Sequence, residues 1–309
     1  MASPLVPTRP FGSTGLQVSL LALGGWHVGA QKTDRAAARL VHAAIDAGVT
    51  FMDNAWDYHA GLSEERMGKA LAGRRDQVFL MTKVCTHGRG AKVAMRQLED
   101  SLRRLRTDHL DLWQIHEVSF DNEPAMHFVR GGVVEALDRA KAQGKVRFVG
   151  FTGHKDPRLH LEMLSHGYHF DACQMPLNCF DGSFRSFEHQ VLPELQRQGI
   201  APIGMKSFCG DARALKAGVA TPQEMLRYTL SLPIATLVSG MDSLDVLAQN
   251  VAVARGFRPM AESRRAALRR RVAAVAADGR FELFKIGISF DGDESRREHG
   301  LPLMNELAH

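Results

Sequence analysis

Four side chains with different acid–base chemistry stand at or just beyond the ends of predicted strands. Asp53, Lys83 and His116 end three successive apolar segments, and Tyr58 follows Asp53 by five residues in the adjoining loop. A carboxylate, a phenol, an amine and an imidazole that meet in one place can donate, accept and stabilise protons at a reacting atom. Each has an ordinary structural explanation by itself, such as a turn cap, a solvated amine or a packed ring. Their joint placement predicts a catalytic site.

The strands that would position these residues recur with a regular spacing. Eight apolar, β-branched or aromatic segments have the length of strands, and their starts lie 24 to 36 residues apart. Several are continuously apolar, which is typical of parallel strands in a covered sheet. The segments span residues 19–25, 49–53, 77–84, 110–116, 146–152, 170–175, 200–205 and 235–241.

Amphipathic helical stretches separate the strands, for example at residues 34–47 and 92–105. Gly48 and Gly199 each follow such a stretch, where a left-handed helix terminator suits glycine. Eight strand–helix units predict an α/β fold, a (β/α)8 TIM barrel over about residues 19–256. In such a barrel the side chains at the carboxyl ends of the strands converge on one mouth. A doubly wound open sheet is the alternative, although no G-x-G-x-x-G motif follows the first strand.

Two segments lie outside the barrel pattern. Residues 9–19 read as a short β-hairpin that caps the barrel floor. The C-terminal extension 257–309 contains one more helix near residues 262–277 and then an irregular tail. Because there is no linker and no second core, we expect a single domain over residues 1–309.

Composition restricts the functional class. The 309 residues are 45% hydrophobic and 24% charged, with a net charge of +5, and no apolar run is long enough to cross a membrane. The excess positive charge lies in one segment, residues 255–271, with seven arginines and one acid. We interpret this arginine-rich segment as a solvated helix face rather than a surface that binds nucleic acid. Four cysteines without a Cys-x-x-Cys pair, and no secretory signal, predict a cytoplasmic protein without a thiolate metal site.

Several segments together resemble the aldo-keto reductase family. They are GVTFMDNAWDY (48–58), VFLMTKV (78–84), LDLWQIH (110–116), GKVRFVGFTG (144–153) and DACQMPLN (171–178). The resemblance runs in the same order from the hairpin to about Asn250, and the last 50 residues lie outside it. It implies a (β/α)8 barrel that uses NAD(P)H, without a metal, to reduce a small-molecule carbonyl to an alcohol.

The resemblance assigns roles to the four residues at the mouth. Tyr58 becomes the general acid, Lys83 and Asp53 its electrostatic partners, and His116 the residue that orients the carbonyl. Hydride delivered to a carbonyl carbon builds negative charge on oxygen, so catalysis needs donors aimed at that atom. An ammonium beside the phenol favours the phenolate and should ease proton donation, and a neutral imidazole suffices for His116.

The resemblance also assigns residues to the cofactor. Gln174 should hold the nicotinamide carboxamide with help from Thr152, Met205 should cover the ring, and Lys206 should point toward the diphosphate. Gly240 and Val246 occupy positions where the family often has a Lys and an Arg for the 2′-phosphate. We favour NADP(H), with NAD(H) left open and Lys206 or Arg255 as compensating cations. The remaining cofactor candidates are Gly24, Gly25, Asp53, Gly240, Gln249 and Asn250.

The expected substrate wall contains aromatic side chains and one acid. Two tryptophans favour an apolar or ring-bearing substrate, and the acid beside His116 could contact a polar or cationic group. These residues are Trp26, Trp56, His59, Glu117 and Phe180.

Three other functions remain open. The same groups run in reverse would oxidise an alcohol or a sugar hemiacetal. A regulatory subunit similar to the potassium-channel β subunits would bind the cofactor with little turnover. A plain interaction scaffold would bind no nicotinamide cofactor at all.

Overall fold

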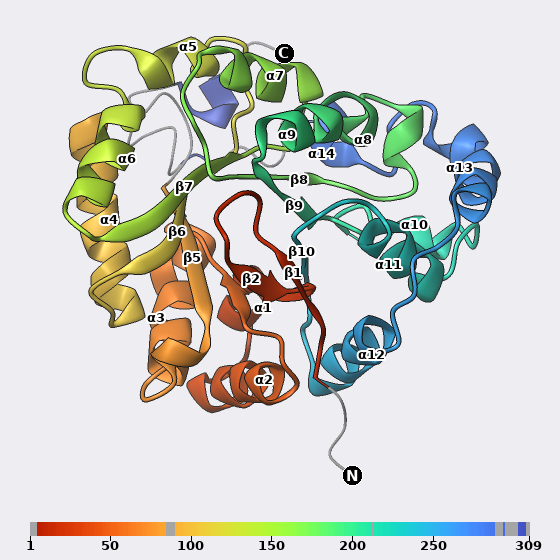
Figure 1. Ribbon diagram of the computed structural model, residues 1–309, viewed down its shortest axis with the longest axis horizontal. Coiled ribbons are helices and arrows are strands. Elements are labelled where there is room, and N and C mark those ends of the chain that lie inside the picture. The colour runs from red at the N-terminus through yellow and green to blue at the C-terminus, as the bar shows by residue number, and fades with distance from the viewer. Residues whose placement is uncertain (1–4, 85–89, 212, 288–292, 294–301, 307–309) are drawn as a thin grey trace.

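Eight parallel strands close into a barrel in the computed structural model of the chain, which describes residues 5–84, 90–211, 213–287, 293 and 302–306 (Figure 1). Each strand pairs with the next along the chain, and the last pairs with the first, Leu237 opposite Leu21. This closure confirms the predicted (β/α)8 barrel over the open-sheet alternative. The strands are β3 (Leu21–Gly24), β4 (Phe51–Asp53), β5 (Phe79–Val84), β6 (Leu110–Ile115), β7 (Val146–Thr152), β8 (Ala172–Pro176), β9 (Ala201–Met205) and β10 (Thr236–Ser239).

A ring of helices covers the outside of the barrel (Figure 1). In α2 (Asp34–Asp46), Thr33 caps the N-terminus by accepting a hydrogen bond from the backbone N–H of Ala36. The apolar stripe expected from the sequence is buried in this helix, which therefore packs on the strands. The ring consists of α2 (Asp34–Asp46), α3 (Leu62–Ala70), α4 (Ala91–Leu105), α6 (Val133–Ala142), α7 (Pro157–Ser165), α9 (Leu192–Gln198), α11 (Pro222–Leu230) and α12 (Leu244–Arg255).

Short helices fill the connections between these elements. They are α1 (Gly25–Gly29), η1 (Tyr58–Gly61), η2 (Arg75–Gln77), α5 (Glu123–Phe128), η3 (Asp181–Ser183), α8 (Phe187–Gln190) and α10 (Arg213–Lys216). One further short helix, η4 (Met304–Glu306), belongs to the C-terminal extension.

A two-stranded hairpin, β1 (Thr8–Pro10) and β2 (Gln17–Ser19), closes the amino-terminal end of the barrel as expected (Figure 1). Phe11 at its turn is fully buried, and its ring lies 5.0 Å from that of Phe79 and 6.0 Å from that of Phe148. Aromatic packing therefore seals this floor, and the carboxyl ends of the strands form the opposite mouth.

The arginine-rich segment forms α13 (Glu262–Ala276), which packs against the barrel through Leu268, Val272 and Ala276. Arg269 pairs with Glu262 and Glu188, and Arg271 pairs with Glu224. Acids of the same helix and of neighbouring elements therefore neutralise part of this positive charge.

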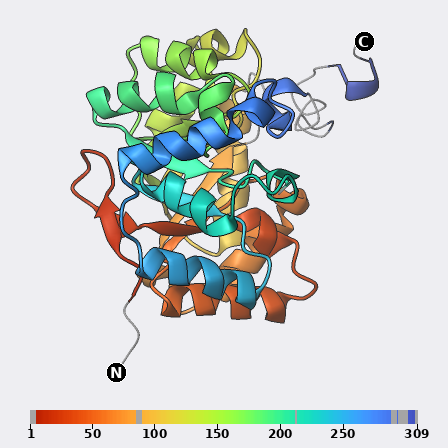
Figure 2. The same cartoon turned by 90° about the vertical axis from the view of Figure 1, so that its right-hand side faces the viewer.

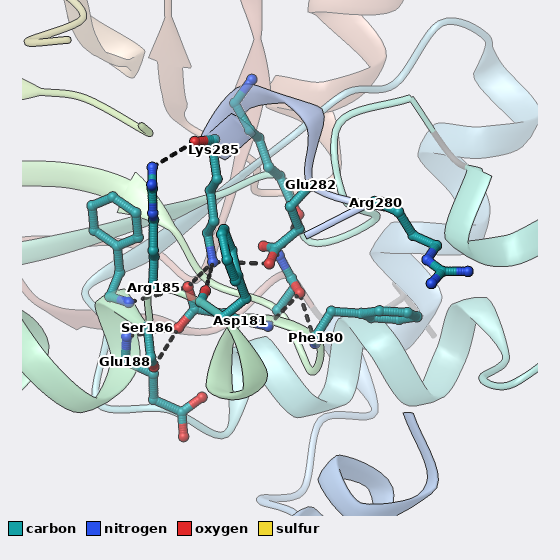
Figure 3. Close-up of polar contacts among 12 residues, drawn as sticks. Phe180, Asp181, Arg185, Ser186, Glu188, Arg280, Glu282 and Lys285 are labelled. Carbon is teal, nitrogen blue, oxygen red and sulfur yellow. Dashed lines mark hydrogen bonds and ion pairs between the residues drawn. The ribbon is translucent and has the colours of Figure 1, made fainter. Parts of the chain in front are cut away.

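The chain then crosses to the mouth end, where α14 (Leu283–Ile286) is held by a buried ion cluster (Figures 2 and 3). The ammonium of Lys285 lies 2.7 Å from a carboxylate oxygen of Asp181 and 2.8 Å from one of Glu282, and all three side chains are fully buried. Asn178 donates a further hydrogen bond to Glu282, and Arg185 donates one to the carbonyl of Lys285. This cluster fixes the α14 segment of the C-terminal extension to the loop after β8. The part of the extension from 288 on lies largely outside the described residues.

Within the residues described, no helix combines the length and the apolar character that a membrane crossing requires.

The ion cluster gives a stability prediction. Lys285→Met should lower the free energy of unfolding by about 3–5 kcal/mol, because two buried carboxylates lose their cation. Urea unfolding followed by circular dichroism measures this loss. Arg280→Met is the matched control, since the Arg280 side chain is 63% exposed and points away from the cluster (Figure 3). Equal stability of the two variants would contradict an essential role for Lys285.

Candidate active site

A buried ion pair between neighbouring strands forms the base of the mouth. The ammonium of Lys83 on β5 donates to a carboxylate oxygen of Asp53 at 2.6 Å and to the carbonyl of Asn54 at 2.7 Å. The side chains of Lys83 and Asp53 are 1% and 4% exposed. A buried ammonium needs such partners, so this pair holds the Lys83 side chain at a defined place.

Tyr58 meets this pair from the loop that follows β4. Its hydroxyl lies 3.5 Å from the ammonium of Lys83, a long contact in which Lys83 is the donor. Burial raises the pKa of Tyr58 well above its usual value, and the charges of Asp53, Asp57 and Glu117 raise it further. This direction is opposite to the one expected from an ammonium beside the phenol. The phenol therefore keeps its proton throughout the physiological pH range.

His116 packs against the same phenol. It follows β6 directly, and its ring lies 5.7 Å from the ring of Tyr58 in an edge-to-face arrangement. Nδ1 of His116 lies 3.5 Å from a carboxylate oxygen of Asp57. Burial alone would raise the pKa of Asp57, but the interactions with His116, a backbone hydrogen bond and the charge of Lys83 together outweigh it, so that the pKa is lowered. The structure thus brings together all four residues predicted from the sequence and adds Asp57.

Two residues expected at the nicotinamide lie beside this cluster. Gln174 lies within β8, with its amide nitrogen 3.4 Å from a carboxylate oxygen of Asp53 and its amide oxygen accepting from Gln114 at 2.9 Å. The hydroxyl of Thr152 at the end of β7 accepts a hydrogen bond from the backbone N–H of Glu117. Both side chains are buried at the mouth end of their strands.

At the end of β9, the rim of the mouth is formed by residues of this strand together with α14 of the C-terminal extension. Met205 and Lys206 are half-buried at the end of β9, and the ammonium of Lys206 lies 5.0 Å from the ring centre of Phe284 on α14. Burial lowers the pKa of Lys206. Phe284 also packs 5.7 Å from the ring of His154, whose Nε2 lies 2.6 Å from a carboxylate oxygen of Glu117. The extension therefore contributes a buried aromatic ring to the rim, which no local sequence signal indicated.

The glycines assigned to the cofactor allow close packing at the strand ends. A Cβ on Gly25 would lie 2.3 Å from the backbone oxygen of Asp53, so only glycine lets the chain after Gly24 approach β4. A Cβ on Gly240 would lie 2.3 Å from the ring of His27. These positions serve the backbone geometry of the mouth.

Three residues assigned to the adenosine end have different surroundings. Gln249 is exposed on α12, whereas Asn250 is buried and donates to the hydroxyl of Ser239 at 3.1 Å. Arg255 points to the carbonyl of Ala47, which precedes β4 at the floor end of the barrel. Arg255 therefore lies at the wrong end of the barrel to compensate for a missing phosphate cation.

The expected substrate wall is only partly open. Trp26 is 51% exposed, and its ring packs 5.4 Å from that of Tyr58 and 4.2 Å from that of His59. Trp56 packs instead under the guanidinium of Arg104 on α4, toward the outer helices. Phe180 is fully buried against Phe281, which corrects the expectation that it faces substrate. Its ring belongs to the packing that seats the C-terminal extension.

In the described part of the chain, no group of three or more histidine, cysteine or acidic side chains has a metal-binding arrangement.

Comparison with known proteins places this geometry in a family. A family model described as the aldo/keto reductase family matches residues 20–216. The methylglyoxal reductase YeaE of Escherichia coli (strain K12) is 34% identical over 211 residues, which cover 65% of this chain and 69% of the relative. The aldo-keto reductase YhdN of Bacillus subtilis (strain 168) is 29% identical over 225 residues, which cover 68% of this chain and 63% of the relative.

Solved structures share the fold. An aldo-keto reductase of Klebsiella pneumoniae in complex with NADPH superimposes with a TM-score of 0.70 at 23% identity, covering 88% of this chain and 96% of that chain.

Proposed function

Because the chain belongs to the aldo/keto reductase family, we propose that it reduces an aldehyde or ketone to an alcohol with a nicotinamide dinucleotide, and that Tyr58 is the general acid. One observation carries the proposal. Lys83 joins the carboxylate of Asp53 to the hydroxyl of Tyr58, and His116 packs on the same phenol at the barrel mouth.

The residues beside the catalytic cluster fit such a cofactor by their chemistry. The amide of Gln174 and the hydroxyl of Thr152 match the donors and acceptors of a carboxamide. The half-buried thioether of Met205 suits the face of a flat ring. The ammonium of Lys206 suits a diphosphate, and Phe284 lies against it on the rim.

The chain's own residues explain the proton transfer. A reduced nicotinamide held by Gln174 and Thr152 would supply the hydride. Negative charge then develops on the carbonyl oxygen, and Tyr58 donates its hydroxyl proton to that atom. Lys83 donates to the phenol oxygen and so stabilises the phenolate that remains, while Asp53 keeps Lys83 in place.

His116 is placed to orient the carbonyl. Its Nδ1 lies 3.5 Å from a carboxylate oxygen of Asp57, and its ring packs edge-to-face on the ring of Tyr58. These contacts hold the imidazole beside the proposed proton donor, so that an N–H of the ring can donate a second hydrogen bond to the carbonyl oxygen.

The protonated phenol favours the reduction direction. An enzyme that mainly oxidises alcohols would need the phenolate as its base, and burial and three acids disfavour that form of Tyr58. The pairing of all four groups also argues against a cofactor-holding subunit with little turnover, because such a protein needs no proton donor.

For the cofactor we propose NADP(H), in line with the NADPH bound to the Klebsiella pneumoniae relative. NAD(H) is the alternative that one observation favours. Asp242 and Asp245 are exposed beside the start of α12, where a 2′-phosphate would meet negative charge.

Tyr58→Phe should lower kcat for carbonyl reduction at least about 100-fold, because the developing alkoxide loses its proton donor. NADPH and NADH consumption over a panel of aldehydes and ketones measures this loss. Affinity for the reduced cofactor should stay within about twofold. Wild-type turnover by the variant would refute the role of Tyr58, and a single burst of cofactor oxidation by the unmodified protein would favour the regulatory subunit.

Asp57→Asn should lower kcat for carbonyl reduction by about 10-fold, because the imidazole of His116 loses the carboxylate beside its Nδ1 and is oriented less precisely. Steady-state rates with a good aldehyde and saturating cofactor measure this loss. Asp121→Asn, which removes an acid with a 79% exposed side chain, serves as the control. Wild-type kcat in Asp57→Asn would exclude the proposed pairing.

The cofactor preference can be measured by quenching of tryptophan fluorescence, because Trp26 lies beside Tyr58. We expect a lower Kd for NADPH than for NADH. The reverse order would replace NADP(H) with NAD(H), and absence of binding by either would favour the interaction scaffold.

A further inference from the structure

The loop that carries Tyr58 has an unusual backbone. Immediately after Tyr58, three consecutive residues have left-handed conformations, with φ values of 53° at His59, 55° at Ala60 and 90° at Gly61. Only glycine adopts this region without cost, so the conformations of His59 and Ala60 are unfavourable by themselves. Surrounding contacts must hold this turn.

Arg104 contacts the loop from the outer helix layer. Its side chain, 17% exposed, reaches from the last turn of α4 and donates to the carbonyl of Trp56 at 2.9 Å. The guanidinium also lies 5.2 Å from the centre of the Trp56 ring. The guanidinium also packs directly against Gly61. A Cβ added to Gly61 would lie only 2.5 Å from the guanidinium carbon, so only glycine leaves room for Arg104 at this position. Arg104 therefore contacts the loop on both sides of Tyr58.

Glu64 connects Arg104 to the strand of the catalytic lysine. This carboxylate on α3 is fully buried, accepts from Arg104 at 3.2 Å, and accepts from the hydroxyl of Thr82 at 2.6 Å. Thr82 precedes Lys83 on β5. A chain of polar contacts thus joins the Tyr58 loop to the strand that holds Lys83.

We propose that Arg104 is a positioning residue of the catalytic site, which sets the distance between the hydroxyl of Tyr58 and the ammonium of Lys83 through the carbonyl of Trp56 and through Glu64. Arg104 contacts neither reacting group. The proposal rests on the proposed role of Tyr58 as the general acid.

The loop has other anchors that preserve the fold without Arg104. The backbone N–H of Trp56 donates to the carbonyl of Lys83 at 3.1 Å, and Nε2 of His59 lies 2.9 Å from the carbonyl of Trp26. These contacts hold the two ends of the loop. Loss of Arg104 should therefore let the middle of the loop move, without unfolding the barrel.

The test compares neighbouring arginines on one helix. Arg104→Met should lower kcat for carbonyl reduction by about 10- to 100-fold, as expected for a small misplacement of the acid, while the Kd for NADPH stays within about twofold. Arg103→Met should keep wild-type values, because the Arg103 side chain is 72% exposed. Wild-type kcat in Arg104→Met, or an equal loss in Arg103→Met, would overturn the proposal.

Hydrogen exchange separates positioning from a general loss of stability. In Arg104→Met the backbone amides of residues 54–62 should exchange faster, while those of β10 stay protected. Uniformly faster exchange would assign Arg104 a structural role only. Arg104→Lys, which keeps a cation for Glu64, should recover part of the lost kcat, and no recovery would count against the proposal.

Tyr58→Phe distinguishes this inference from the function on which it rests. Low kcat in Tyr58→Phe with wild-type kcat in Arg104→Met rejects the positioning role alone. Wild-type kcat in Tyr58→Phe rejects the proposed function.

Discussion

The buried ion pair between Lys83 and Asp53 is the constraint on which the mouth of the barrel depends. An ammonium almost without solvent contact needs a carboxylate at hydrogen-bond distance, and Asp53 supplies it from the adjacent strand. In the parallel register of β4 with β5, which pairs Met52 with Leu80, Lys83 stands two residues beyond the position opposite Asp53, and its long side chain reaches the carboxylate across the two strands. Tyr58 and His116 are then arranged around this ion pair, so the position of the proposed acid follows from the geometry of the sheet.

The charges around Tyr58 also determine what the phenol can do. Three carboxylates and burial outweigh the single ammonium, so the proton stays on the oxygen until a stronger base forms nearby. An alkoxide produced by hydride transfer is such a base. In the proposed mechanism, Tyr58 therefore releases its proton only when negative charge develops on the carbonyl oxygen.

The sequence was sufficient for the parts of the structure that repeat. The eight strands lie where their apolar segments predicted, and Asp53, Lys83 and His116 converge because the carboxyl ends of parallel strands in a barrel must meet. Contacts made by loops could not be predicted from strand spacing.

The contact between Asp57 and His116 depends on the turn after β4, and the only indication of it in the sequence was an acid directly before Tyr58. The burial of Phe180 under Phe281, and of Phe284 against Lys206, depends on packing between segments about 80 to 100 residues apart. The position of Arg255 followed from the direction of α12, which runs from the mouth to the floor.

The order in which the barrel closes has a consequence for its synthesis. The proposed acid, its electrostatic partners and the orienting histidine all lie between residues 53 and 116, whereas the barrel wall is completed only when β10, ending at Ser239, pairs with β3. A nascent chain that has emerged as far as β6 therefore carries the whole reactive set on an open sheet, with the edge of β3 unpaired. Such an edge is a template for pairing with other chains. Ribosomal pausing between β6 and β10 would thus prolong the stage at which this protein is most exposed to misassembly.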